Sequence, residues 1–344
     1  MEKLLIVDGS SMLVTCYYAT LPKEVMFAKT EEEKIESYKK ILQTSDGVYT
    51  NAVFGMLRII KKILEYQKPE YICFCFDMSR NTFRRDMYKE YKAQRSKTPS
   101  PLSSQFVLME KILESLGFKV LYDKQYEADD LAGSVAKKFE TEVKTFLMTK
   151  DHDYLQLAND YTRIWMVQTS DEKAEALYSQ FYYPSGHTRR TLNLPPRVFE
   201  YTKTHVKTLE GVWPDQIPDL KGIMGDASDN IPGVKGVSSA AAPLLSEYGT
   251  VENLYDTIES CNEKELKELV KFWKESLGIK RSPLNALTKE SETELVGKEA
   301  ALLSKSLATI KTDIPITFGL EDMSATYDES ILKDILKQLE IKTL

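Results

Sequence analysis

The chain has 344 residues, of which 42% are hydrophobic and 28% charged. This composition is typical of a globular protein with one large domain or two medium ones. The formal net charge of −6 argues against a general nucleic-acid coat protein. No apolar run approaches the length of a membrane-spanning helix. The N-terminal stretch MEKLLIVDGS passes directly into a polar turn, unlike a signal peptide, so we expect a cytoplasmic protein without a membrane anchor.

Short apolar runs alternate with longer helical patterns in the first half of the chain. The patterns predict strands at 3–7, 71–76, 118–122 and 143–148, and helices at 51–66, 103–117 and 126–139. The strand runs are continuously apolar, which is typical of strands buried on both faces. Strands separated by helices predict an α/β fold, with a mainly parallel sheet covered by helices on both sides.

Carboxylates follow three of the predicted strands at the point where each strand ends. Asp8 closes KLLIVD, and Asp77 closes YICFCFD. Asp151 and Asp153 follow VKTFLM after two residues. Because ligands of open parallel sheets bind outside the carboxyl ends of the strands, we expect these side chains to share one edge of the sheet.

The stretch YEADDLAGSVAKKF crowds three acids, Glu127, Asp129 and Asp130, into the start of the predicted helix at 126–139. Carboxylates near a helix N-terminus are stabilised by the helix dipole, so a capping role is one interpretation. A third acid adds repulsion between like charges, which favours a second interpretation as ligands of a cation. The helix follows a strand directly, so its first turn is expected at the same sheet edge.

The second half of the chain is mainly helical. A Gly- and Pro-rich stretch at 222–245 predicts a turn region that opens into a helix, and it contributes Asp226 and Asp229. Nine acids in one cleft could not all stay ionised without compensating charge. Mg²⁺ favours a few carboxylates together with waters. Paired metal ions of this kind activate water and stabilise the reacting oxygens in phosphodiester cleavage.

A basic segment runs from Arg80 to Lys97, with seven basic residues and three interleaved aromatic ones. Such patches are usually solvated faces, but they also suit a single strand threaded past phosphates and stacked bases. Signatures of other chemistries are absent from the sequence. It contains no GxSxG motif, no Walker glycine–lysine motif and no dinucleotide-binding glycine pattern after the first strand.

Taken together, the motifs resemble the 5′→3′ exonuclease and flap endonuclease family, which includes the N-terminal nuclease of bacterial DNA polymerase I. They are IVDG, CFD, FRRDMYKEYKAQR, YEADD, TKDHDYLQL and MGDASDNIPGVKG. The resemblance implies a three-layer, PIN-like or RNase-H-like α/β core with a helix-hairpin-helix subdomain. It implies a nuclease core at 1–190 with a basic arch near 80–100. A helical DNA-binding domain is expected at 191–317, with its hairpin near 222–248, and a helical tail at 318–344.

The resemblance also implies roles for single residues. A tighter metal site is expected from Asp8, Asp77, Glu127, Asp129 and Asp130, and a second site from Asp151, Asp153, Asp226 and Asp229. Lys92 and Arg84 are expected over the scissile phosphate, where they would offset charge in the transition state. DNA contacts are expected from Tyr91, Arg95, Arg85, Gly233, Lys235 and Gly236, with Tyr91 stacking a base. The implied cofactors are two or more Mg²⁺ ions, replaceable by Mn²⁺, and a K⁺ ion at the hairpin.

The implied function is that of a structure-specific 5′→3′ exonuclease or flap endonuclease in DNA replication and repair. Its substrates would be DNA with a 5′ flap, nick or overhang, or an RNA–DNA hybrid. A nucleoid-associated monomer with a DNA polymerase as partner is expected. Two alternatives stay open, a non-catalytic protein that binds branched DNA and a PIN-type ribonuclease. The hairpin departs from the family's pattern at 237–243, which has neither a second glycine nor a lysine.

Overall fold

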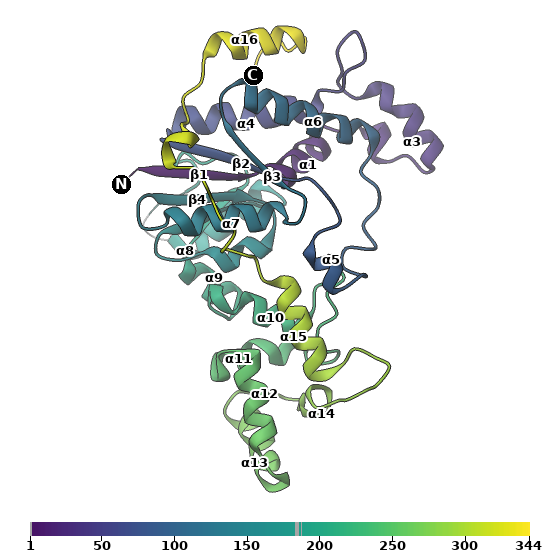
Figure 1. Cartoon of the computed structure of the whole chain (residues 1–344), viewed down its shortest axis with the longest axis vertical. Coiled ribbons are helices and arrows are strands. Elements are labelled where there is room, and N and C mark those ends of the chain that lie inside the picture. The colour runs from purple at the N-terminus through teal and green to yellow at the C-terminus, as the bar shows by residue number, and fades with distance from the viewer. Residues whose placement is uncertain (1, 183–185, 187) are drawn as a thin grey trace.

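A six-stranded sheet forms the centre of the computed structural model, which describes residues 2–182, 186 and 188–344 (Figure 1). The strand order is β3-β2-β1-β4-β5-β6. Strands β1 to β5 are parallel, and β6 is antiparallel to β5. The strands are β1 (Lys3–Asp8), β2 (Tyr71–Asp77), β3 (Lys119–Asp123), β4 (Lys144–Thr149), β5 (Thr162–Val167) and β6 (Val198–Tyr201).

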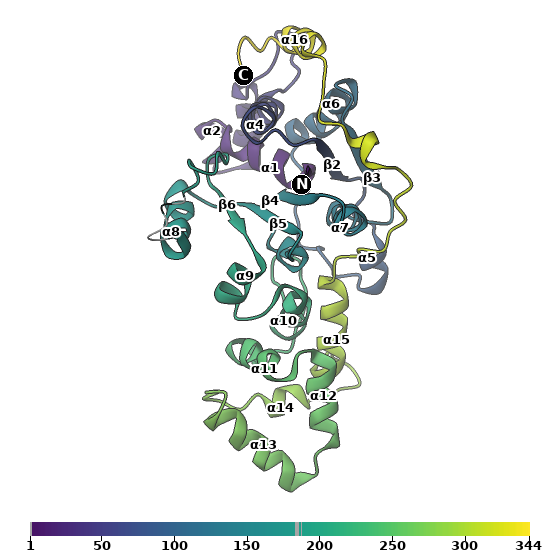
Figure 2. The ribbon, with the colours of Figure 1, turned by 90° about the vertical axis from the view of Figure 1, so that its left-hand side faces the viewer.

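Helices cover both faces of this sheet. Figures 1 and 2 show α1 (Gly9–Ala19), α4 (Asn51–Gln67) and α6 (Ser100–Ser115) on one face and α7 (Ala128–Phe139) on the other. The side chains of β1 and β2 are almost completely buried, because both of their faces are covered. The predicted three-layer α/β core with a mainly parallel sheet is confirmed.

Two strands of the sheet were not predicted. The apolar run TRIWMV forms β5, and the four-residue VFEY forms β6 at the sheet edge. β6 lies beyond residue 191, so the expected boundary between 190 and 191 falls before the last strand of the sheet. A four-residue edge strand contributes too little apolar pattern to be recognised from sequence alone.

The second half of the chain forms a helical domain that extends away from the sheet (Figures 1 and 2). Its helices are α9 (Lys203–Glu210), α10 (Ile217–Met224), α11 (Ala241–Tyr248), α12 (Val251–Ser260), α13 (Glu263–Glu275), α14 (Leu284–Leu287) and α15 (Gly297–Ala308). Helices α10 and α15 pack side by side, and α13 lies at the end farthest from the sheet. One continuous cluster of buried apolar side chains joins this domain to the sheet domain.

The last part of the chain returns to the sheet domain. Ser324 forms a β-bridge with Tyr71, and the Ala325 N–H donates to the Glu70 carbonyl at 3.0 Å. Helix α16 (Glu329–Gln338) then lies above α4 and α6 in Figure 1. The expected tail at 318–344 is therefore part of the sheet domain's surface.

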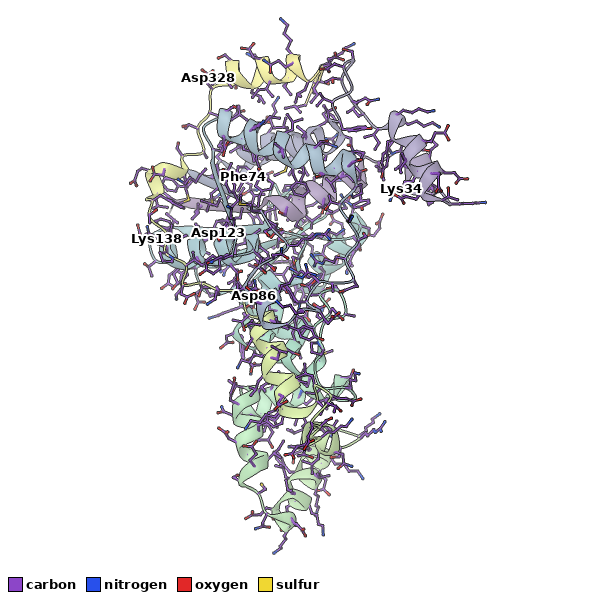
Figure 3. All side chains as sticks on the ribbon, turned by 45° about the vertical axis from the view of Figure 1, so that its right-hand side comes forward. Lys34, Phe74, Asp86, Asp123, Lys138 and Asp328 are labelled. Atoms are coloured by element: carbon purple, nitrogen blue, oxygen red, sulfur yellow. The ribbon has the colours of Figure 1, made fainter. Side chains whose placement is uncertain are left out.

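The remaining elements are short, apart from α8. They are α2 (Lys23–Met26), α3 (Glu31–Ser37), α5 (Phe83–Met87), α8 (Asp171–Tyr182), and the 3₁₀ helices η1 (Tyr38–Lys40), η2 (His152–Leu157), η3 (Pro214–Gln216), η4 (Ser238–Ala240) and η5 (Leu320–Met323). Helix α5 lies within the basic segment, near the junction of the two domains, where Figure 3 labels Asp86.

Among the described residues, no helix has both the length and the apolar character needed to cross a membrane.

Candidate active site

The carboxyl ends of β1 and β2 hold two of the predicted acids. Asp8 ends β1 and caps α1, because its carboxylate accepts from the Ser11 N–H at 2.9 Å. Its other oxygen accepts from the Thr149 hydroxyl at 2.7 Å. Burial, together with the charges of Asp77 and Asp151, raises the pKa of Asp8 to about 7. Asp8 therefore lies close enough to these two acids to respond to their charges.

The N-terminus of α7 joins the same edge. Asp77 ends β2 and accepts from the Ala128 N–H at 2.9 Å. Glu127 is the N-cap of α7, and the Asp130 carboxylate accepts from the Glu127 N–H at 3.0 Å in a capping box. The capping interpretation of the YEADD stretch is therefore confirmed. Burial raises the pKa of Asp129 well above its usual range, against the opposing effect of Arg84.

Cations of the basic segment compensate the other two acids of this stretch. The Lys92 ammonium lies 2.5 Å from Glu127, and its charge helps to hold the pKa of that carboxyl below its usual value in spite of burial. Glu127 also accepts from the Thr82 hydroxyl at 2.9 Å. Arg84 forms a two-point ion pair with Asp130, with both N–O distances 2.7 Å. The repulsion expected among these acids is thus relieved by side chains of the chain itself.

A second group of acids lies between η2 and the loop that follows α10. Asp151 caps η2, and Asp153 lies in its first turn. The Lys221 ammonium bridges Asp153 and Asp226, at 2.6 Å from the latter. Asp229 pairs with Arg95 and lies 3.5 Å from the Lys92 ammonium. Lys92 therefore connects the first group of acids to the second.

Lys221 is a cation beside the predicted acids that sequence reasoning missed. It lies on α10, five residues before Asp226 and on no predicted motif. The signal that could have found it is helical spacing, since a lysine about one turn before GDASDN faces the same loop. Only the tertiary structure brings Asp153 to the same ammonium group.

The basic segment is docked onto the loop at 226–231. The Lys92 N–H donates to the Asp229 carbonyl at 2.9 Å, and the Asn230 amide donates to the Glu90 carbonyl at 2.7 Å. The Gln94 amide donates to the carbonyls of Ala227 and Ser228. The segment therefore forms a strap, here residues 88–95, between the sheet domain and the helical domain.

Three of the expected roles do not fit the placement of their residues. Arg84 was expected over the scissile phosphate, yet its side chain is 1% exposed and also donates to the carbonyls of Leu307 and Thr309. Tyr91 was expected to stack a base, yet it is buried against Leu307, and its hydroxyl contacts Glu127. Asp130 was expected as a metal ligand, yet it is fully buried and both oxygens are engaged by Arg84 and backbone N–H groups. Arg84 and Asp130 instead join α5, α7 and the end of α15, and Tyr91 packs the strap against Leu307 of α15.

The expected DNA-contacting residues divide into exposed and buried ones. Arg95, Lys235 and Gly236 are exposed, and Arg85 is half-buried. Gly233 is buried, and its backbone packs so closely on Gly225 that a β-carbon there would lie 2.2 Å from the Gly225 nitrogen. Gly233 therefore has a structural role in the hairpin turn.

The altered part of the hairpin still forms a helix start. Ser238 has a φ of 30° and opens η4, and α11 begins at Ala241. Pro243 therefore lies in the first turn of α11, where a backbone N–H has no partner within the helix.

The donor set fits a hard divalent cation. Asp8, Asp77 and Asp151 have no ion-pair partner in the described part of the chain, and carboxylate oxygens are the ligands that such ions prefer. In the described ranges, no three Asp, Glu, His or Cys side chains already converge as ligands of one ion. Lys92 and Lys221 lie between the carboxylates instead. For Glu127, Asp153, Asp226 or Asp229 to hold a metal ion, the ammonium group paired with that carboxylate would have to shift.

Comparison with known proteins gives two family matches. Residues 3–182 match a family model described as the 5′-3′ exonuclease N-terminal resolvase-like domain, and residues 212–330 match the 5′-3′ exonuclease C-terminal SAM fold. DNA polymerase I of Bacillus subtilis (strain 168) is 34% identical over 350 residues, which cover 100% of this chain and 32% of the relative. DNA polymerase I of Caldicellulosiruptor bescii is 33% identical, covering 99% and 33%. The chain thus spans about a third of the length of these relatives.

Two groups of solved structures share the fold. A T5 5′-exonuclease with bound divalent metal ions (zinc) has a TM-score of 0.56 and 18% identity, with 99% of each chain covered. The catalytic core of Rad2 in complex with DNA substrate has a TM-score of 0.52 and 14% identity, covering 99% of this chain and 88% of the other. At these identities the likeness concerns the fold, and it confirms the predicted sheet core with an appended helical domain.

Proposed function

Since the chain belongs to the 5′-3′ exonuclease family, we propose that it is a Mg²⁺-dependent nuclease that hydrolyses phosphodiester bonds near the 5′ end or branch point of DNA. Its substrates are a 5′ flap, a nick or an overhang. Mn²⁺ substitutes for Mg²⁺. The observation that carries the proposal is the gathering of carboxylates from β1, β2, α7, η2 and the 226–231 loop beneath a basic strap.

The carboxylates are the side chains that would ligate the metal ions. We assign Asp8, Asp77, Glu127 and Asp129 to one site, and Asp151, Asp153, Asp226 and Asp229 to the second. Asp130 supports the first site from behind, through its bonds to Arg84 and to the Glu127 backbone. When bound, divalent ions lower the pKa of water and stabilise the attacking and leaving oxygens.

The strap supplies mobile positive charge. The Lys92 ammonium is paired with Glu127 and Asp229, so it would be free to contact a phosphate oxygen if these two carboxylates held a divalent cation. Lys221 stands in the same relation to Asp153 and Asp226. We propose that both lysines turn toward the substrate's phosphates, where Lys92 offsets charge in the transition state.

DNA beyond the reacting bond is held by exposed residues of both domains. Arg85 and Arg95 lie on or beside the strap, and Lys235 and Gly236 lie at the hairpin turn. A K⁺ ion at the hairpin, a DNA polymerase partner, a monomeric state and a nucleoid-associated, cytoplasmic location belong to the same proposal. These four points follow from the resemblance.

The test is cleavage of a labelled 5′-flap DNA with Mg²⁺, compared with an RNA flap of the same sequence. We expect cutting near the branch that stops in excess chelator and in Asp8→Asn, while Asp46→Asn, a change outside the site, cuts normally. Cutting that persists in chelator would contradict the metal mechanism. Tight flap binding without turnover in Mg²⁺ or Mn²⁺ would favour the non-catalytic alternative, and preference for the RNA flap would favour the ribonuclease.

A further inference from the structure

Tyr154 is a buried tyrosine beside the candidate site, and its hydroxyl has no hydrogen-bond partner. It belongs to η2, the 3₁₀ helix that Asp151 caps and that carries Asp153. Its side chain is 1% exposed. Its Oη is one of five buried side-chain atoms without a partner in the described part of the chain. Buried polar groups are almost always hydrogen-bonded, so the unpaired hydroxyl of Tyr154 calls for an explanation.

The surroundings of this hydroxyl are acidic. Burial raises the pKa of Tyr154 well above its usual value, and the charges of Asp8, Asp129 and Asp151 raise it further. All three are assigned metal ligands. A tyrosine hydroxyl carries one hydrogen that it can donate, and the carboxylates whose charges act on it are acceptors.

The other unpaired hydroxyls of tyrosines lack this relation to the site. Tyr255 lies on α12 of the helical domain, and the charge that acts on it is that of Glu259. Tyr17 lies on α1, and it responds to neighbouring tyrosines. Of these three tyrosines, Tyr154 alone lies on the element that Asp151 caps and that carries Asp153, so its unpaired hydroxyl calls for an explanation connected with the site.

We propose that Tyr154 is a positioning residue of the metal centre, and that its hydroxyl hydrogen-bonds a carboxylate or a water that ligates the divalent cation. The cation itself rests on the proposed function. Groups that orient metal ligands from behind typically change metal affinity by about 10–100-fold when they are removed. The cost of the unpaired hydroxyl in the resting protein is offset when the cation binds.

Two variants make a matched comparison. Tyr154→Phe and Tyr255→Phe each remove one unpaired buried hydroxyl and keep the packed ring. In the absence of metal, we expect both to unfold in urea at concentrations equal to or above that of the wild type. Mn²⁺ binding to the full chain, measured by calorimetry without DNA, should weaken about tenfold in Tyr154→Phe and stay unchanged in Tyr255→Phe. Mn²⁺ should also raise the unfolding temperature of Tyr154→Phe less than that of the wild type.

Each other outcome contradicts the proposal in a recognisable way. Equal Mn²⁺ affinity in the wild type and Tyr154→Phe would mean that Tyr154 is only a core tyrosine. Destabilised metal-free Tyr154→Phe would mean that the hydroxyl already has a partner. A wild type that binds no Mn²⁺ would overturn the metal centre itself. Failure of the nuclease proposal is separate, because a wild type that binds Mn²⁺ but never cuts DNA leaves the role of Tyr154 intact.

Discussion

Lys92 combines an unusual backbone conformation with contacts to two acids of the site. Its φ of 53° lies in the left-handed region that most side chains avoid. Its N–H is bonded to the Asp229 carbonyl, and its ammonium is shared by Glu127 and Asp229. Strained conformations persist where the surrounding structure fixes them, often at functional sites. The strap therefore holds this one ammonium group at the meeting point of both acid groups.

Lys92→Ala tests the role of that ammonium group. We expect turnover of a 5′-flap substrate to fall about 100-fold, because a positive charge near the transition state is lost, while flap binding falls far less. Single-turnover cleavage and equilibrium binding measure the two effects separately. Lys89→Ala is the control, since Lys89 lies on the same strap but is largely exposed. Equal losses in binding and turnover would mean that Lys92 only grips the backbone of the DNA.

Arg84 and Asp130 form a buried ion pair, and its loss has a predictable cost. Arg84→Met leaves the Asp130 carboxylate buried without its cation, so we expect the free energy of unfolding to fall by about 3–5 kcal/mol. Arg84→Met combined with Asp130→Leu removes both charges and should recover part of this loss. Urea unfolding of both variants measures the two free energies of unfolding. If Arg84→Met were as stable as the wild type, water would have to reach Asp130 in solution.

At the scale of elements, the acids of the site are also helix caps. Asp8 caps α1, Glu127 caps α7 and Asp151 caps η2. Because each of these elements begins at the carboxyl end of a strand, the caps and the site occupy the same sheet edge. The capping and metal-ligand interpretations of these acids are therefore compatible.

The hairpin turn offers a second matched pair of variants. At Gly233 (φ 61°) an added β-carbon would meet the Gly225 backbone, whereas at Gly236 (φ 94°) it would meet nothing within 4 Å. We expect Gly233→Ala to lower the free energy of unfolding by about 2–4 kcal/mol, through a clash and an unfavourable φ. Gly236→Ala should cost about 1 kcal/mol, through φ alone. If urea unfolding showed the same loss in the free energy of unfolding for Gly233→Ala and Gly236→Ala, this explanation would be wrong.

The start of α9 makes stability depend on pH. His205 lies in the capping box of Thr202, packed among the rings of Phe181 and Phe199, and burial lowers its pKa from the usual 6.5. The unfolded chain therefore takes up a proton near pH 6.5, whereas the folded protein does so only at lower pH. The free energy of unfolding contributed by this group must fall as pH falls through that window.

His205→Gln isolates this contribution, because glutamine at the same position can still accept the Thr202 N–H. We expect urea unfolding between pH 5 and 7 to show a smaller pH dependence in this variant than in the wild type. An unchanged dependence would show that other groups account for it. His152→Gln is the control variant, because the side chain of His152 is exposed.

At the scale of the whole molecule, the final 27 residues, 318–344, stabilise the sheet domain by packing against it. Met323 is completely buried, the Ala325 N–H donates to the Glu70 carbonyl before β2, and the Lys138 ammonium donates to the Phe318 carbonyl. We expect a chain ending at residue 317 to unfold at a temperature lower by about 5 °C or more, because buried apolar area is exposed. A chain ending at residue 340 is the control and should unfold near the wild-type temperature.

The sequence determined the parts of this protein that depend on local pattern. Continuous apolar runs specified β1 to β4, helical spacing specified α4, α6 and α7, and strand-end positions specified the edge where Asp8, Asp77 and Asp151 meet. The parallel topology follows from these patterns, because strands separated by helices can hardly pair otherwise. Motifs in the sequence were also sufficient to indicate the family.

Only the tertiary structure decided which acid meets which cation. Arg84 and Asp130, Lys221 and Asp153, and the orphaned hydroxyl of Tyr154 are pairings, or absent pairings, of side chains far apart in the chain. Sequence motifs treat all charged residues of a segment alike, whereas burial separates them. Arg84 and Tyr91 are enclosed while Arg95 stays exposed, because α5 and the strap pack onto α15 and the 226–231 loop.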